Sequence, residues 1–321
     1  MQSEKYLPEG SLIGTKENIK LISSAEGLEK AIESEMILEA VAEKCDENLN
    51  LTVDLGGGIE GIIPRSEIQY CMPGEEMREI AAITRVGKAV CFKVMKMSCR
   101  GGKIVAYLSR RAAQEECRER FTSLLVPGDI IEAKVTHLEN FGAFIDIGCG
   151  LVSLLSIDCI SVSRISHPRD RLFIGERIPV VVTAVDRDGE TPGRIYVSHK
   201  ELLGTWEENA ARFTPGQTVS GIVRGVESYG IFVELAPNLT GLAEYRPDIE
   251  VGQTAAVYIK SIIPEKSKIK LVLIDSYKGE PPSTHTRFDF ESLPKHVDFW
   301  RYSNNSPTRY FQSYSQNDYF C

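Results

Sequence analysis

The sequence predicts an all-β protein with three tandem five-stranded barrels and short helical connectors. The first observation is a repeated pattern, which starts with Pro-Gly at 127–128 and again at 215–216 and runs along a strand to a turn. After the turn come two aromatic residues three positions apart, in Phe141–Ile147 and in Tyr229–Leu235. The second observation is that short, glycine-bounded strand segments recur at similar spacing. Such repetition indicates copies of one small unit.

The N-terminal segment 1–35 is expected to be a leader with one short helix. Ser23 or Ser24 is placed to cap this helix, and Leu28, Ala31 and Ile32 give it an apolar face.

The first repeat is predicted over 36–112, and Gly56–Gly58 is expected to form a turn between two of its strands. A glycine run that joins strand to strand has no helix N-terminus behind it, so it does not predict a phosphate cradle. The expected strands of this repeat are 37–42, 49–55, 61–64, 89–95 and 104–109.

The second repeat is predicted over 126–203 and the third over 213–275. The expected strands are 130–138, 141–147, 151–155, 177–185 and 194–198 in the second, and 218–226, 230–235, 240–243, 254–262 and 268–273 in the third. Five short strands with an aromatic pair are typical of a Greek-key barrel of OB type, which binds oligonucleotides on one face. The connectors 110–125 and 199–212 are rich in helix formers.

Composition excludes several classes of protein. No apolar run of eighteen residues occurs, so no membrane contact is expected, and the first residues do not resemble a signal peptide. The 8 cysteines form no Cys-x-x-Cys pair and the 5 histidines do not cluster with them, so neither a metal nor another cofactor is expected. Free thiols fit a reducing, cytoplasmic location. Ser198-His199 lacks an obvious acidic partner, and no nucleophile–base pair indicates an enzyme.

The net charge of -8 is unfavourable for a protein that binds phosphate by charge alone. The excess is uneven, however, because 36–112 has a net charge of +1, 126–203 of -3 and 213–275 of -1. Any nucleic-acid binding must therefore depend on stacking and on locally placed cations.

The second repeat resembles the RNA-binding domain named after the S-one protein of the bacterial small ribosomal subunit. The matching residues are Gly128, Val135, Phe141, Gly142, Phe144, Asp146, Gly148, Gly175, Val180, Val182, Arg194, Ile195, Ser198 and Lys200. The resemblance extends over 36–275 in three copies. The chain is therefore similar to a short, three-repeat member of the bacterial ribosomal S-one family.

The resemblance implies an RNA-binding face in the second and third repeats. In the second it consists of Phe141 and Phe144, with Asp186 and Arg194 beside them and Ser156 in place of the family's histidine. In the third, Tyr229 and Phe232 match the aromatics, Lys268 replaces the arginine, and Glu244 and Pro264 depart from the pattern. The first repeat has Leu49, Thr52 and Pro64 at these positions, which implies docking on protein instead.

The residues themselves leave two interpretations of the aromatic pair open. Exposed rings stack on unpaired bases. Residues three apart on a strand point to opposite faces, however, so one ring belongs in the core unless Gly142 allows a bulge.

Cations near these rings are the candidates for phosphate contacts. The loop 161–171 contains Arg164, Arg169 and Arg171, which could form a phosphate clamp or simply be solvated. Lys268 and Lys270 are two apart on a strand and share a face.

The tail, 276–321, contains many of the aromatic residues of the chain. Disordered segments are usually poor in aromatics, so 296–302 is expected to pack on a barrel or a partner, or to add a stacking site around Trp300. Whether the end from Ser303 onward is mobile is left open.

The leading hypothesis is a cytoplasmic, non-enzymatic protein that binds single-stranded RNA, such as mRNA, with low base specificity. The resemblance implies translation as the process and small ribosomal subunit proteins as partners. The first alternative is a protein-binding adaptor that kept the barrels and lost RNA affinity. The second is an accessory module for RNA turnover.

Overall fold

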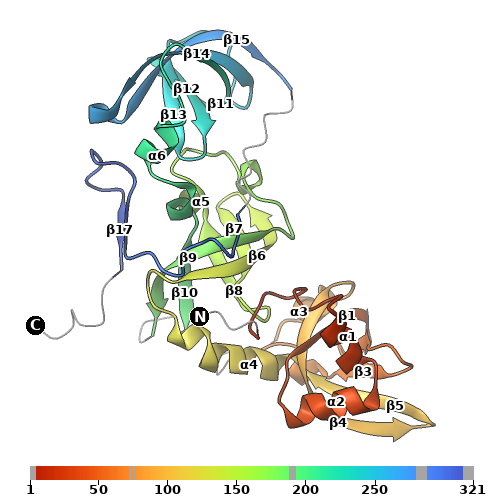
Figure 1. The fold of residues 1–321 in the computed structure, drawn as a ribbon. Helices are drawn as coiled ribbons and strands as arrows, with labels where there is room; N and C mark the ends of the chain where they lie inside the picture. The colour runs from red at the N-terminus through yellow and green to blue at the C-terminus, as the bar shows by residue number, and fades with distance from the viewer. Residues whose placement is uncertain (1–4, 72–73, 75–76, 188–192, 280–287, 314–321) are drawn as a thin grey trace, which may run out of the picture. The chain divides into compact units, whose positions relative to one another are not determined.

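The computed structural model describes residues 5–71, 74, 77–187, 193–279 and 288–313 (Figure 1). These residues form two compact units. The first runs up to Leu125 and includes Asp146–Val152, while the second comprises Val126–Ile145 and the residues from Ser153 onward. Within the described residues, no helix is both long and apolar enough to cross a membrane.

The first unit contains a closed barrel with the strand order β1-β2-β3-β5-β4. Its strands are β1 (Leu38–Cys45), β2 (Leu51–Asp54), β3 (Glu60–Ile63), β4 (Ala89–Arg100) and β5 (Lys103–Ser109). Alternate strand residues such as Leu51 and Val53 are buried, because neighbours along a strand point to opposite faces. Gly56, Gly57 and Gly58 form the predicted turn with φ of 78°, 60° and 77°.

The leader folds onto this barrel and contains two helices rather than the predicted one. They are α1 (Lys16–Ile22) and α2 (Ala25–Glu33), and Ser24 caps the second of them by accepting a hydrogen bond from the Gly27 N–H. Leu21 and Leu28 from these helices join the core of the barrel. The other helical elements of the unit are η1 (Arg65–Glu67), α3 (Glu79–Ile83), α4 (Arg110–Arg120) and η2 (Thr122–Leu124).

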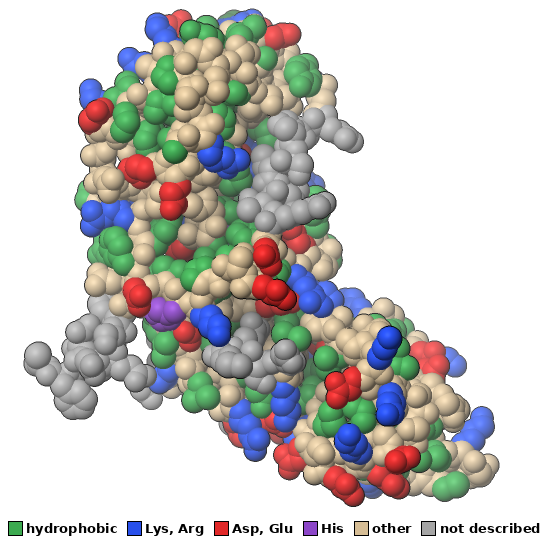
Figure 2. All heavy atoms as spheres, in the orientation of Figure 1, with side chains coloured by type: hydrophobic (Ala, Val, Ile, Leu, Met, Phe, Trp, Pro, Cys, Tyr) green, Lys and Arg blue, Asp and Glu red, His purple; other side chains and the backbone are tan. Residues whose placement is uncertain are grey.

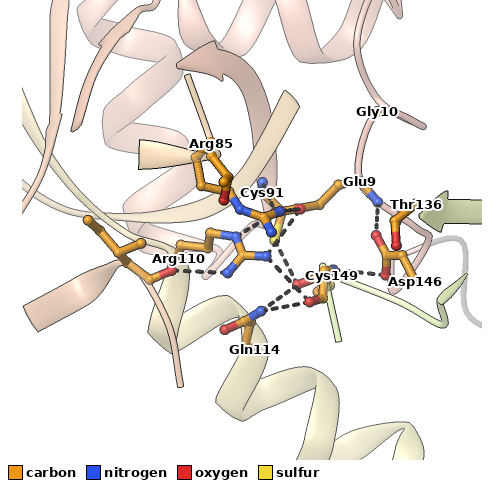
Figure 3. A network of polar contacts seen from close by, with 12 residues as sticks. Glu9, Gly10, Arg85, Cys91, Arg110, Gln114, Thr136, Asp146 and Cys149 are labelled. Atoms are coloured by element: carbon orange, nitrogen blue, oxygen red, sulfur yellow. Dashed lines mark hydrogen bonds and ion pairs between the residues drawn. The ribbon is translucent and has the colours of Figure 1, made fainter. Parts of the chain in front are cut away.

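A buried polar network holds the first unit together (Figure 3). The Arg110 guanidinium donates to the Glu9 carboxylate at 2.6 Å from Nε and 3.1 Å from Nη2. Burial is the largest single influence and opposes ionisation of Glu9. The charge and hydrogen bonds of Arg110, the charge of Arg85 and the hydrogen bond from the Cys91 N–H together outweigh burial and lower the pKa of Glu9. The Glu9 N–H donates to Asp146, and burial, followed by the Glu9 charge, raises the pKa of Asp146 to about 7. The segment around Glu9 is thereby fixed to α4 and to the turn after Asp146.

The second unit begins with a five-stranded sheet in the order β10-β9-β6-β7-β8. Its strands are β6 (Ile130–Glu139), β7 (Gly142–Asp146), β8 (Val152–Ser156), β9 (Arg177–Asp186) and β10 (Arg194–Ser198). This sheet has β10 and β8 at its edges, so it differs from the predicted closed barrel. A side chain connects the edges instead, because the Ser153 hydroxyl donates to the Ile195 carbonyl at 2.7 Å.

The third sheet is again a closed barrel, in the order β11-β12-β13-β15-β14. Its strands are β11 (Thr218–Glu227), β12 (Gly230–Ala236), β13 (Leu239–Ala243), β14 (Thr254–Ile263) and β15 (Lys268–Tyr277). Helical elements of this unit are α5 (Ile157–Ile160), η3 (Pro168–Asp170), η4 (Lys200–Leu203), α6 (Trp206–Ala210) and η5 (Pro264–Lys266). The protein is thus mostly β, with five-stranded barrels that are closed or nearly closed.

The aromatic tail packs on the second unit and forms a small hairpin of β16 (Phe299–Arg301) and β17 (Tyr310–Gln312). The main chain of Lys295 and Val297 bonds to Ile130 and Gly128 beside the middle sheet. Trp300 is buried. The predicted packing of 296–302 therefore agrees with the structure, and the expected mobile end is partly ordered, because β17 lies beyond Ser303.

Candidate nucleic-acid interface

The two predicted aromatics of the middle repeat lie side by side at the start of β7. Phe141 is 54% exposed and sits in the turn before the strand, whereas Phe144 is half-buried within it. Their ring centroids are 6.1 Å apart and the ring planes are nearly perpendicular, at 88°. Because Phe141 precedes the strand, the alternation of faces does not apply to this pair, and neither ring is a core residue.

Gly142 has a different role from the bulge that was considered from the sequence. A Cβ at this position would overlap the Leu155 carbonyl oxygen and lie 3.0 Å from the Ser156 Cα. Glycine therefore permits the close approach of β8 to the aromatic turn. The same contact brings Ser156 next to Phe141, whose carbonyl accepts a hydrogen bond from the Ile157 N–H at 2.9 Å.

The third repeat builds the same arrangement from different residues. Tyr229 is 68% exposed, and its ring centroid lies 6.0 Å from that of Phe232 at an angle of 87°. A Cβ on Gly230 would lie 2.6 Å from the Ala243 carbonyl oxygen, so glycine is again needed after the first aromatic. Two aromatic pairs of equal geometry are therefore presented by the second unit.

Strand register places a lysine in line with the second of these pairs. Phe232 pairs with Leu242, and Leu242 pairs with Lys270. Directly paired residues project from the same face of a sheet. Lys268 is exposed two positions earlier on β15, so both lysines lie on one face, and this face also carries Phe232. Glu244, also exposed, follows β13 nearby.

Asp186 and Arg194 pair in register at the ends of β9 and β10. Arg194 is exposed, and its guanidinium carbon lies 5.2 Å from the centroid of the Tyr196 ring. Cation–π contact holds the charged group close to the barrel surface. Tyr196 is 41% exposed and was not predicted from the sequence as a site residue. It is two residues from Arg194 on β10, so the two side chains share the outer face.

His137 is a second residue that sequence reasoning missed. Its ring centroid lies 6.3 Å from that of Phe144, with the planes 28° apart, so it extends the aromatic surface. Its position at the end of β6, beside the strand that carries the aromatics, was the available signal.

The basic loop divides into exposed and buried arginines. Arg164 and Arg169 are exposed, as a phosphate clamp requires. Arg171 is buried, and its guanidinium forms an ion pair with the buried Glu234. The structure therefore places Arg171 in the packing between the middle and third repeats, so it belongs neither to the phosphate clamp nor to the solvated loop that the sequence left open.

The outer face of the first barrel has an aromatic in an unexpected place. Thr52 pairs with Ile62, and Ile62 pairs with Tyr107. The corresponding row of paired residues in the third repeat has its aromatic on β12, whereas in the first barrel the aromatic is on β5. Lys96 lies over the Tyr107 ring at 4.9 Å. The predicted absence of an aromatic pair at Leu49 and Thr52 stands.

No group of three or more potential metal ligands occurs among the described residues.

Comparison with known proteins extends this picture. Residues 125–197 match the family model described as the S1 RNA binding domain. The chain is 28% identical over 293 residues to the small ribosomal subunit protein bS1 homolog of Bacillus subtilis, covering 89% of this chain and 71% of that protein. It is 27% identical over 316 residues to the Staphylococcus saprophyticus protein bS1, and the alignment covers 93% of this chain and 76% of that protein. It is 31% identical over 196 residues to the Rhizobium meliloti protein bS1, and the alignment covers 60% of this chain and 32% of that protein.

The chain therefore resembles the bacterial ribosomal S1 proteins over most of its length. The resemblance predicted from the sequence is thereby confirmed. The domain match spans most of the middle repeat, which is also the repeat with Phe141, Phe144 and Arg194 on its surface.

Proposed function

We propose that this protein, which resembles the bacterial S1 proteins, binds single-stranded RNA with little base specificity during translation. It would act in the cytoplasm as a non-enzymatic partner of the small ribosomal subunit. The match to an RNA-binding domain and the likeness to small-subunit proteins support RNA binding linked to the ribosome. Messenger RNA is the single-stranded RNA that this setting supplies.

One observation carries the proposal. Phe141 with Phe144 and Tyr229 with Phe232 form perpendicular ring pairs in which the leading ring is more than half exposed. An exposed ring offers its flat face to an unpaired base, and every base has such a face, which is the reason for low specificity. Arg194, Lys268 and Lys270 supply cations for the intervening phosphates.

The first barrel supports the part of the proposal that concerns ribosomal proteins. Helix α3 exposes Ile80 (59%) and Ile83 (50%), and Val86 (40%) follows one turn later. Aliphatic side chains three apart on a helix form one apolar strip, which suits a protein partner better than a nucleic acid. This barrel would dock on small-subunit proteins while the second unit holds RNA.

The experiment is to replace Phe141 and Phe144 together by alanine and to measure the affinity for an unstructured oligoribonucleotide. Loss of one stacked base costs about 1–3 kcal/mol, so the dissociation constant should rise at least about fivefold. The matched control is Tyr277→Ala, which removes a ring of equal exposure (54%) at the far end of β15. An unchanged affinity, with an unchanged melting temperature, would reject stacking on this face.

The adaptor alternative is favoured by Glu244 on the third barrel and by the net charge of -8. It predicts no RNA binding even at low salt. Co-purification of the tagged chain with ribosomes rather than with a nuclease would separate a role in translation from one in RNA turnover.

A further inference from the structure

The C-terminal hairpin presents aromatic rings and a cation on one face. Arg301 pairs with Tyr310, so their side chains project to the same side, and Phe299 shares that side because it is two residues from Arg301 on β16. Phe299 is 51% exposed and Tyr310 is 55% exposed. The Arg301 guanidinium carbon lies 5.4 Å from the Phe299 ring centroid.

The opposite side of the hairpin anchors it to the second unit. Trp300 is only 7% exposed. The Tyr302 carbonyl accepts from the Trp206 N–H at 2.7 Å, and the Tyr302 hydroxyl donates to the Asn238 carbonyl at 2.8 Å. A further bond of 2.7 Å joins the Ser303 and Ser267 hydroxyls. The exposed rings are therefore held in place by the fold.

A cavity of about 280 Å³ opens beside this face. Its lining includes Lys200 and Arg309, together with Asp158, Ser161, Trp300 and Tyr310. The Lys200 ammonium donates to the Asp158 carbonyl at 3.1 Å, which holds that cation at the cavity. Two cations against one carboxylate favour an anionic ligand, and Tyr310 belongs both to the cavity and to the exposed face.

We propose that the hairpin is an additional RNA contact, in which a base stacks on Tyr310 or Phe299 and the adjoining phosphate enters the cavity toward Lys200 and Arg309. This inference rests on the proposed function and adds a contact outside the S1 domain match, which ends at residue 197. The cations favour RNA over an apolar protein surface, because such a surface would leave Arg301 and Arg309 without partners of opposite charge, whereas a phosphodiester chain supplies one per nucleotide.

The test uses the full chain with Phe299→Ala and Tyr310→Ala combined, and oligouridylates of two lengths, one short and one long enough to span several sites. The long oligomer should bind at least about fivefold more weakly to the variant, because a stacked base is lost. The short oligomer should bind almost normally, since it is held by the middle repeat. Photocrosslinking of a 4-thiouridine oligomer to wild-type protein should label the peptide that contains Tyr310. Tyr277→Ala is again the matched control.

The possible outcomes separate this inference from the proposed function. If only Phe141→Ala with Phe144→Ala weakens binding, and no crosslink maps to the hairpin, the hairpin proposal is rejected and RNA binding stands. If only the hairpin variant weakens binding, the hairpin is an RNA contact and the face of the middle repeat is not. If uridine monophosphate alone saturates the cavity and the long oligomer does not crosslink there, the ligand is a free nucleotide and the proposed strand contact is wrong.

Discussion

His199 is a buried histidine of the second unit. Its Nδ1 lies 2.7 Å from the Pro179 carbonyl oxygen, which can only accept, so Nδ1 carries the proton of the neutral ring. The ring packs edge-on against Phe288 at 5.2 Å. Burial is the main reason that the pKa falls to about 4, and the charge of Arg171 lowers it further, against the opposing hydrogen bond.

The depressed pKa predicts a loss of stability in acid. The ordinary pKa is 6.5, so between this value and about 4 the unfolded chain takes up a proton that folded His199 does not. The free energy of unfolding of the second unit should therefore fall by roughly 3 kcal/mol as the pH drops through this window. Urea unfolding at about pH 7 and about pH 4.5 measures the fall.

Substitution isolates this residue from other acid-sensitive groups. His199→Gln has no charge to gain, so its stability should change less with pH than that of the wild type. His137→Gln is the control, because the His137 side chain is 60% exposed. Equal pH dependence of wild type and His199→Gln would show that His199 is not responsible.

Single residues also show what a sequence can and cannot predict. The family resemblance placed Phe141 and Tyr229 on a binding face, and both rings are exposed. Strand alternation alone left the direction of Phe141 open, because the predicted strand 141–147 included this residue, whereas β7 begins at Gly142. Arg171 could not be distinguished from Arg164 and Arg169, since its partner Glu234 is 63 residues away in the sequence.

At the level of elements, buried ion pairs join the basic loop to the third barrel. Glu234 on β12 is fully buried and accepts from Arg171 and, at 2.7 Å, from Nε of Arg224. Arg224 also contacts Asp170 at 3.2 Å. Two arginines thus depend on Glu234, and their guanidinium groups are less than one-tenth exposed.

Removing the shared carboxylate should destabilise the second unit strongly. Glu234→Gln removes the buried carboxylate charge that both guanidinium groups share, and breaking a buried ion pair typically costs about 3–5 kcal/mol. The control Asp248→Asn breaks an exposed pair with Arg246 and should cost much less, because solvent screens that pair. Denaturant unfolding compares the two variants. Similar midpoints for both would mean that the buried pairs do not hold this part of the fold together.

The strands were predictable because alternating burial and turn glycines are local signals. The predicted starts and ends agree with the structure to within a few residues in most strands, and β4 and β15 run longer than predicted. The predicted leader helix, capped at Ser23 or Ser24, corresponds to α2, and the seven-residue α1 before it was missed. The three-residue strands of the tail hairpin are too short for any periodicity, and tertiary contacts through Trp300 and Tyr302 fix them.

For the whole molecule, the net charge of -8 does not describe the candidate interface. On the face shown in Figure 2, lysines and arginines are interspersed with acidic side chains rather than gathered into one broad patch. Exposed Arg164, Arg169 and Arg194 belong to the middle repeat, and Lys268 and Lys270 to the third. RNA binding should therefore combine a moderate salt dependence with a stacking contribution that salt does not remove.

A salt titration tests this balance. The log–log slope of single-stranded binding steepens by about 0.7 for each phosphate contact, so these five cations alone would contribute about -3.5. Arg164→Gln with Arg169→Gln should make the slope shallower by about 1.4 if both arginines contact phosphate. Arg246→Gln, at another exposed arginine (44%), is the control and should change it little. If the double substitution leaves the slope unchanged, the loop is merely solvated. An absence of binding at the lowest salt would favour the adaptor, because stacking without any phosphate contact should still be measurable at that salt concentration.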